Sequence, residues 1–249
     1  MRAAGPTTNC GAEGIGDFEN NFSLDGWDET THEGGIWWKK DRQLKNAIAN
    51  ELFIAIAARL YLRTGTQIFL DWALLAWNWF DKSGLINAQY LIINGFEEWP
   101  PTWTYIQGVI LGALSDISTI TGETKYRKLA QTIADSVLSS ELVTPDGILT
   151  EFRTEEDPSI YYQDGYQFKG IFIRNLAYLF ESTNDLKYRG FIEANARAVL
   201  KSRNRFNQYG KSWYARSYKD DHPDFARQTS AIDCLNAALT VLGPTWAPP

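Results

Sequence analysis

The sequence is poor in the residues that build several common functional sites. Its two histidines, His32 and His222, are isolated, which leaves almost no material for a histidine-based metal centre or a Ser-His-Asp triad. Its two cysteines, Cys10 and Cys234, permit one bridge but no disulfide framework. The glycines of "GAEGIG" at 11–16 have the wrong spacing for a dinucleotide loop, and no strand precedes them. We therefore expect no metal and no cofactor.

Charge and hydrophobicity exclude two further classes of partner. With 24 basic and 30 acidic residues the net charge is −6, and no basic stripe is present, so we expect no nucleic-acid partner. Lys, Arg, Asp or Asn interrupts every apolar run, so we expect no membrane segment in this chain. The N-terminus lacks the apolar core of a signal peptide. We expect an irregular segment over 1–26 and one helical domain over 27–249.

What the sequence does contain is a repeated helical hairpin. Each hairpin breaks at a threonine followed by a glycine or asparagine able to take positive φ. Two of the breaks precede the same tripeptide, Lys-Tyr-Arg, at 125–127 and 187–189. This self-similarity indicates a repeat of αα units. The expected helices span 43–63, 66–80, 103–120, 124–139, 167–182, 185–201 and 225–242, and "GILTEF" at 147–152 is a candidate short strand.

The two helices of a hairpin differ in character. First helices are apolar all round, as over Ile54–Leu62 and Ile171–Phe180, which predicts burial on every side. Second helices are amphipathic. An inner ring of buried helices inside an outer ring indicates an all-α fold, the α/α toroid, with an open α-solenoid as the competing architecture. Gly108 and Gly112, four apart on one helix, favour close helix packing.

Polar and aromatic side chains recur at the start of each first helix. In a toroid these ends converge at one mouth, where rings and amides suit a neutral polyhydroxyl ligand. The predicted binding residues are Trp37, Trp38, Asn46, Asn50, Glu51, Thr104, Tyr105, Gln107, Asp164, Phe168, Lys169 and Gln228. Two alternatives stay open: Gln43, Asn46 and Asn50 share one stripe and are able to bond each other or a neighbouring helix, and Thr104 is able to act as an N-cap.

Aromatic residues and carboxylates are the materials of a sugar site. The chain has 10 Trp, 12 Tyr and 13 Phe; most of these rings belong to the core, and a minority suits the apolar face of a pyranose. A glycosidase needs two carboxylates, about 5–5.5 Å apart for retention or about 6.5–9.5 Å for inversion. The candidates near the mouth are Asp41, Glu51 and Asp164.

Several long motifs resemble those of glycoside hydrolase family 76. They are "GGIWWKKDRQLKNAIANELF" (34–53), "TYIQGVILGAL" (104–114), "DGILTE" (146–151), "DGYQFKGIFIRNLAYL" (164–179) and "QTSAIDCLNAAL" (228–239). The resemblance implies an (α/α)6 toroid of twelve helices, endo-acting hydrolysis of α-1,6-linked mannan with retention, and a secreted or cell-wall location as in fungi and bacteria. The implied ligand is α-mannan or a mannose-containing oligosaccharide.

The chain departs from that family in two respects. The resemblance implies two consecutive catalytic aspartates, but the only Asp-Asp here, Asp220-Asp221, is near the C-terminus and does not match their position. Seven of the twelve implied helices are found. We therefore expect an incomplete toroid with unassigned catalytic residues, whose open flanks make the chain aggregate or dimerise. A truncated gene model and a degenerate homologue both fit, and a non-catalytic carbohydrate-binding remnant or a helical-repeat scaffold is the alternative function.

Overall fold

The computed structural model describes residues 26–97, 101–151, 163–214 and 224–246. Within these ranges it contains seven α-helices and one 3-10 helix. They are α2 (Ala47–Thr64), α3 (Gln67–Lys82), α4 (Thr104–Thr121), α5 (Thr124–Leu138), η1 (Gln163–Gln167), α7 (Phe168–Thr183), α8 (Leu186–Ser202) and α9 (Phe225–Leu242). The predicted strand at 147–152 is wrong over its described part, because there is only an isolated antiparallel bridge between Val143 and Leu149.

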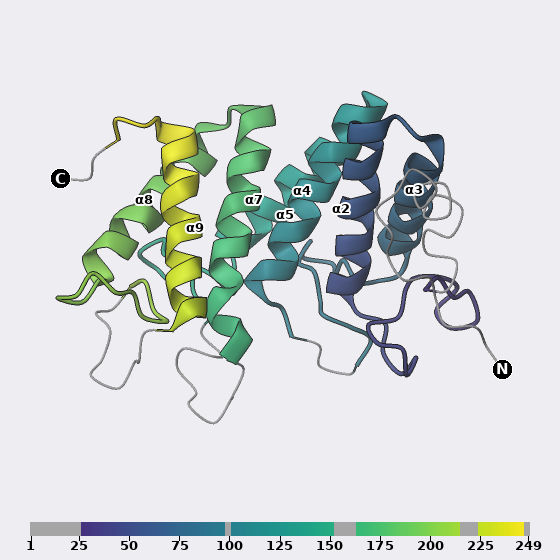
Figure 1. The fold of residues 1–249 in the computed structure, drawn as a ribbon, viewed down its shortest axis with the longest axis horizontal. Helices are drawn as coiled ribbons and strands as arrows, with labels where there is room; N and C mark the ends of the chain where they lie inside the picture. Colours follow the sequence, from purple (N-terminus) through teal and green to yellow (C-terminus); the bar gives the residue numbers. More distant parts are fainter. Residues whose placement is uncertain (1–25, 98–100, 152–162, 215–223, 247–249) are drawn as a thin grey trace, which may run out of the picture.

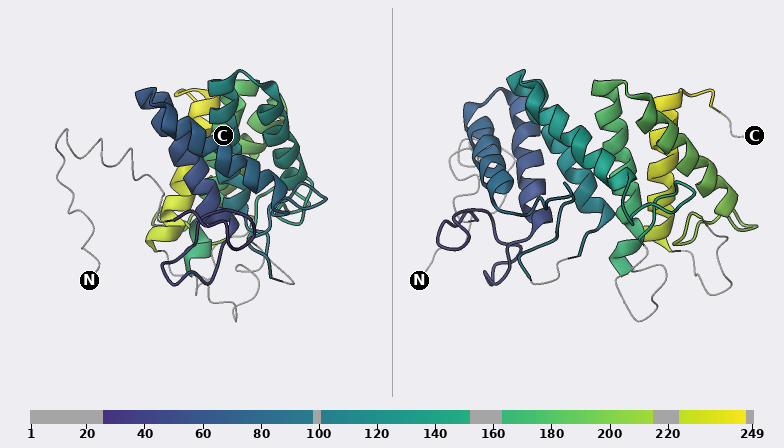
Figure 2. Two further views of the ribbon diagram at one scale, coloured as in Figure 1. Left: turned by 90° about the vertical axis from the view of Figure 1, so that its right-hand side faces the viewer. Right: turned by 180° about the vertical axis from the view of Figure 1, so that it is seen from behind.

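The helices form the two layers of an α/α toroid, which confirms the predicted fold class. One layer is a row in which α2 packs on α4, α4 on α7, and α7 on α9. The second layer holds α3 against α2, α5 against α4, and α8 against α9 and α7. In Figure 1, α2 and α9 lie towards opposite ends of the row, and the view from behind in Figure 2 brings the second layer forward.

The turn inside each hairpin is built by one local device. Gly65, Gly122 and Asn184 end the first helices in the left-handed region, with φ of 69°, 72° and 53°. The threonine before each of them donates its hydroxyl to the carbonyl four residues back and accepts the N–H two residues ahead. The recurring Thr-Gly or Thr-Asn pair thus closes one helix and starts the next.

Glycines let the first-layer helices approach closely. A Cβ on Gly108 of α4 would lie 2.6 Å from the Cα of Phe172 on α7, and one on Gly170 would lie 2.8 Å from the Cα of Ser230 on α9. Gly112 faces a side chain instead, since its Cβ would lie 2.5 Å from Oδ1 of Asn175. The predicted role of Gly108 and Gly112 in close packing is confirmed, and it is strictest at Gly108.

The repeated Lys-Tyr-Arg tripeptide connects neighbouring second-layer helices. Tyr188 on α8 is fully buried, and its hydroxyl donates to Asp135 Oδ1 on α5 at 2.9 Å. Lys187 Nζ donates to the other oxygen of Asp135 at 2.6 Å. The matching Tyr126 on α5 packs edge-on against Trp77 of α3. The tripeptide therefore joins each outer helix to the one before it.

Burial of the first helices is less complete than the sequence predicts. In α4, 14 of 18 residues are buried, as expected. In α2, however, Leu52 is 45% exposed and Ile56 is 52% exposed, so the prediction of burial on every side is wrong for that helix. In α9, Ile232 and Leu239, seven residues apart, are 50% and 41% exposed. Both ends of the row thus present apolar side chains to solvent.

Cys234 is a free, fully buried thiol on α9. Cys10, with which the sequence permits a bridge, lies outside the described residues. Burial raises the pKa of the Cys234 thiol. Within the described part of the chain, no helix is both long and apolar enough to cross a membrane.

Candidate functional site

The starts of α2, α4, α7 and α9 gather at one side of the molecule, the lower side in Figure 1. We call this side the mouth. Asn46 and Asp224 cap α2 and α9 with their own side chains, Asn46 Oδ1 accepting from Ala49 N at 3.3 Å. Helices α4 and α7 have no side-chain cap from the residue that precedes them. The positive ends of these four helices therefore lie in a row along the side where the sequence predicts a ligand.

The side-chain amides at the mouth form hydrogen bonds with the backbone of neighbouring loops. Asn50 accepts from Ile36 N at 2.8 Å and donates to Ile36 O at 3.2 Å and to Asn46 O at 2.8 Å. Gln107 accepts from Ile92 N at 2.8 Å and donates to Ile92 O at 2.7 Å. Both amides are fully buried. This arrangement supports the alternative in which these groups satisfy one another and neighbouring segments.

Gln228 follows the same scheme on α9, where its amide donates to Tyr209 O at 2.9 Å. On α8, Asn195 accepts from Leu149 N at 2.8 Å and donates to Gly147 O at 3.3 Å. Sequence analysis missed Asn195 because it lies in the middle of an outer helix. Each loop at the mouth is thus bonded to an amide of a helix.

Two buried lysines hold further loops in place. Lys45 is 2% exposed, and its Nζ donates to the carbonyls of Asp28, Thr31 and Gly34 at 2.5–2.7 Å. Lys169 on α7 is 1% exposed; its Nζ donates to Lys211 O and lies 5.0 Å from the centre of the Trp213 ring. Carbonyl oxygens compensate for the loss of water around each ammonium group.

A carboxylate from the loop after α5 caps α4. Glu151 Oε1 accepts from Thr104 N at 2.7 Å and also from the Thr104 hydroxyl. Glu151 is 2% exposed and lies 47 residues from its partner. Thr104 is thus the capped residue and not the cap. Sequence analysis placed Glu151 in a motif but gave it no role, because no local pattern links it to α4.

An aromatic cluster spans the starts of α4 and α7. The Tyr105 and Phe168 rings stack with centroids 4.0 Å apart and planes 28° apart. Trp103 meets Phe168 edge-on at 5.8 Å. Tyr105 is half-buried, whereas Trp103 and Phe168 are buried. Tyr105 therefore presents this cluster to the mouth.

Carboxyl groups from three segments surround Tyr105. Burial raises its pKa, and the charges of Glu51, Asp164 and Glu151 raise it further, in that order. Glu51 lies on α2, Asp164 in η1, and Glu151 in the loop after α5. Acids from three separate segments thus act on the phenol beside the stacked rings.

Glu51 differs from the other two acids. It is fully buried, and neither carboxyl oxygen has a hydrogen-bond partner. Burial raises its pKa well above the ordinary value, because removal from water penalises the charged form. Asp164, by contrast, is exposed. The third candidate carboxylate, Asp41, is also exposed, and its Oδ1 accepts from Gln43 N at 3.3 Å.

Two tryptophans precede α2 at the same side. Trp38 is 50% exposed, and Lys39 Nζ lies 4.1 Å from the centre of its ring. Trp37 is half-buried, and its Nε1 is buried without a hydrogen-bond partner. Lys45 Nζ lies 4.7 Å from the centre of the Trp37 ring.

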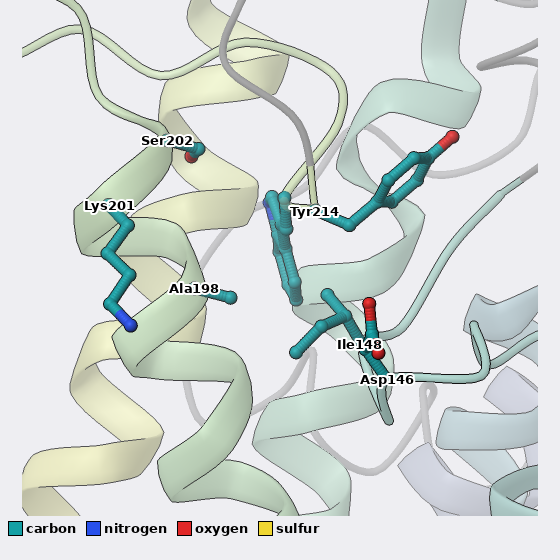
Figure 3. A pocket seen from close by; sticks show the side chains of 7 residues that line it. Asp146, Ile148, Ala198, Lys201, Ser202 and Tyr214 are labelled. Atoms are coloured by element: carbon teal, nitrogen blue, oxygen red, sulfur yellow. The ribbon is translucent and has the colours of Figure 1, made fainter.

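A separate hollow of about 520 Å³ lies at the end of α8. Asp146, Ile148, Ala198, Lys201, Ser202, Trp213 and Tyr214 line it. In Figure 3, Ile148 and Ala198 point into the hollow, whereas the Tyr214 ring extends away from it. None of the predicted binding residues lines it. Across the described residues no group of three or more His, Cys, Asp or Glu side chains is placed to hold a metal ion.

Comparison with known families identifies the family to which this chain belongs. The model of glycosyl hydrolase family 76 matches residues 19–246, which is most of the chain. The chain belongs to glycosyl hydrolase family 76. Mannan endo-1,6-alpha-mannosidase DCW1 of Saccharomyces cerevisiae is 28% identical over 164 residues, covering 60% of this chain and 36% of the relative. A putative mannan endo-1,6-alpha-mannosidase of Schizosaccharomyces pombe is 24% identical, covering 88% of this chain and 54% of the relative.

Solved structures of family 76 share the fold. The GH76A alpha-1,6-mannanase of Salegentibacter superposes with a TM-score of 0.78 at 23% identity, covering 92% of this chain and 69% of that one. An inactive double variant of that enzyme, with asparagine in place of two consecutive aspartates, was solved with alpha-1,6-mannotriose. The Lin0763 protein of Listeria innocua gives 0.79 at 24% identity, covering 93% and 66%. This chain thus spans about a third to a half of the curated relatives and about two thirds of the solved structures.

Proposed function

We propose that this chain is part of a glycoside hydrolase that cleaves α-1,6-linked mannan within the polymer, and that the mouth binds the saccharide. Family membership supports the reaction class. The names of the relatives, and the mannotriose bound to the solved enzyme, support mannan as the substrate. The observation that carries the proposal is the stacked Tyr105–Phe168 pair at the starts of α4 and α7, where three carboxyl groups act on the pKa of Tyr105.

The chemistry of the mouth suits a neutral sugar. The exposed edge of an aromatic cluster packs against the apolar face of a pyranose, while carboxyl groups bond its hydroxyls. We assign the direct contacts to Tyr105 and Phe168, with Trp37 and Trp38 at the rim and Asp164 and Glu51 as hydrogen-bonding groups. The remaining predicted binding residues have partners inside the protein, and their contact with ligand stays a prediction: Asn46, Asn50, Thr104, Gln107, Lys169 and Gln228.

Two carboxylates carry out this reaction in retaining glycosidases. One attacks the anomeric carbon, and the other first donates a proton to the leaving oxygen and then accepts one from water. The resemblance implies consecutive aspartates for these roles. Asp220 and Asp221 lie outside the described residues, and their place in the sequence does not match that pair. We therefore assign no catalytic residue within this chain.

A carbohydrate-binding remnant without turnover is the second candidate. It is favoured by the short span of the chain against its relatives, 36% and 54% of their length, together with the unmatched aspartate pair. This candidate shares the mouth and differs only in the absence of bond cleavage.

The test is binding and turnover of α-1,6-mannan by the native protein. We expect release of α-1,6-mannooligosaccharides, and we expect Phe168→Ala to weaken mannotriose binding at least tenfold because it removes the stacked platform. Phe206→Ala is the matched control, since Phe206 is 65% exposed in a loop outside the proposed contacts. Binding without product release supports the remnant. Native protein that does not bind mannotriose contradicts both candidates.

We further propose that the protein works outside the cell or at the cell wall, where mannan of this kind is met as a polymer. Family membership supports this location, and fractionation of the source organism tests it. Recovery of the native protein only with soluble intracellular proteins contradicts it.

A further inference from the structure

Glu51 is a buried acid that the fold does not use. Its side chain is fully buried on α2, and both of its oxygens lack a partner. The other buried charges nearby are satisfied: Glu151 bonds to Thr104, and Lys45 bonds to three carbonyls. An unsatisfied buried carboxyl lowers stability, so its presence calls for a binding role.

A second unpartnered group lies on the segment bonded to the start of α2. Trp37 Nε1 is buried and has no hydrogen-bond partner. Asn50 is the residue before Glu51, and Ile36 is the residue before Trp37. The side chain of Asn50 bonds both Ile36 N and Ile36 O, so it holds the two segments together. An indole donor and a carboxyl group therefore lack partners on two segments that Asn50 holds together. Ligand hydroxyls, which both donate and accept, are able to satisfy each of these groups.

Glu51 also adjoins the proposed saccharide platform. Of all charged groups, its carboxyl has the largest influence on the Tyr105 phenol. Tyr105 stacks on Phe168 and is half-buried at the mouth. The helices that carry the two residues, α2 and α4, pack on each other, so a sugar ring resting on Tyr105 lies next to the helix that carries Glu51.

We propose that Glu51 binds the saccharide as a neutral carboxylic acid, whose O–H donates a hydrogen bond to the oxygen of one sugar hydroxyl. This inference rests on the proposed function, and it adds a specificity residue to the same mouth. A neutral acid accepts and donates one bond each, which matches a hydroxyl and disfavours an anionic ligand. No proton is transferred, so the contact contributes binding and not catalysis.

Burial is what favours the protonated acid at Glu51. The other charged groups that act on Tyr105 alongside Glu51 are Asp164 in η1 and Glu151 after α5, and both are acids. Lys45 directs its ammonium group to the carbonyls of the 27–36 loop. The ionisable residues of α3, the other helix packed on α2, are exposed: Asp71, Asp81 and Lys82. Burial without a compensating cation raises the pKa of Glu51 well above its ordinary range.

The experiment measures α-1,6-mannotriose affinity as a function of pH for the native protein and two variants. Glu51→Gln keeps the shape and offers a donor and an acceptor at every pH, whereas Glu51→Leu offers neither. We expect native affinity to fall as pH rises through the pKa of Glu51, Glu51→Gln to bind with little pH dependence, and Glu51→Leu to lose at least about tenfold at every pH. Glu181→Gln, an exposed position on the far end of α7, controls for loss of a carboxylate.

The outcomes separate this inference from the proposed function. Native binding with unchanged affinity in Glu51→Leu overturns the role of Glu51 and leaves the proposed function standing. Native affinity whose pH dependence persists in Glu51→Gln overturns the neutral-acid assignment. Native protein that fails to bind mannotriose at any pH overturns the proposed function and this inference together. A protonated-carboxyl infrared band at neutral pH, present in native protein and absent in Glu51→Gln, supports the neutral acid independently of ligand.

Discussion

The two ends of the inner helices are held by different means. At the end away from the mouth, each turn is closed by a threonine and a left-handed residue whose partners lie within four positions. At the mouth, partners are far apart in sequence: Asn50 with Ile36, Gln107 with Ile92, and Thr104 with Glu151, separated by 14, 15 and 47 residues. One end is therefore specified locally, and the other forms only once loops distant in sequence have packed on the helices.

At the far end, the buried carboxylate of Asp116 bonds to two residues that are distant in sequence. Asp116 on α4 accepts from Arg59 Nε of α2 at 3.0 Å and from the Tyr178 hydroxyl of α7 at 2.5 Å. Burial and this carboxylate raise the pKa of Tyr178 to about 12. This cluster joins three inner helices with every oxygen of Asp116 bonded. Glu51 at the mouth, by contrast, has no partner for either carboxyl oxygen, which is in keeping with the binding role proposed for it.

The largest loss of stability is expected where the mouth end of α4 meets α7. Gly108→Ala forces its new Cβ to within 2.6 Å of the Phe172 backbone, which has to shift, and we expect a loss of about 3 kcal/mol. Gly112→Ala is the control one turn further on, where only the end of the Asn175 side chain has to move. Urea unfolding measures both, and equal losses would contradict a backbone contact at Gly108.

Removal of the α4 cap is expected to cost less. Glu151→Ala leaves the buried N–H of Thr104 without its acceptor, and we expect a loss of about 2 kcal/mol in the free energy of unfolding. Glu141→Ala, at an exposed position after the same helix α5, is expected to change stability by less than about 0.5 kcal/mol. If Glu151→Ala unfolds like its control, the cap does not stabilise α4.

Substitutions in the turns at the far end are expected to change the free energy of unfolding least. Gly122→Ala puts a Cβ on a residue with φ of 72°, with no atom within 4 Å to clash, so we expect only the conformational cost of about 1 kcal/mol. Asn184→Gly, at the matching turn, is expected to gain a few tenths of a kcal/mol, since glycine takes that conformation freely. Thermal unfolding checks both signs.

Glu51→Gln should change stability in a pH-dependent way, with no effect in strong acid. The pKa of Glu51 is about 4.5 in the unfolded chain and well above that when folded, because the carboxyl is buried. The native state thus holds its proton more tightly, and native stability falls as pH rises from about 4.5 through the folded pKa. The variant does not titrate there, so its advantage grows from zero over that window. Parallel stability curves from pH 4 to 8 would disprove an uncompensated buried acid.

The helices were predictable because their signals are local. The Thr-Gly and Thr-Asn pairs set the far ends, and α9 spans 225–242 as predicted. The first helix begins at Ala47, later than predicted, because Asn46 turns out of the helix to cap it. Loop residues such as Glu151 were missed because no periodicity connects residues of different hairpins.

The composition of the mouth was predictable, but the direction of each side chain was not. Asn50 and Gln107 looked like ligand-binding amides because they recur at helix starts, yet the same recurrence serves loops that follow a common path. Polarity alone does not distinguish a group bonded to a backbone from one left unbonded. Glu51 stands out only after the partners of its neighbours have been counted.

The cap on α4 has a consequence for synthesis. Thr104 and Glu151 are separated by 47 residues, so α4 leaves the ribosome with its first turn open and waits roughly 2–10 s for the acid that closes it, at about 5–20 residues per second. The first turn of α4 is therefore completed only after the whole α4–α5 hairpin has been synthesised.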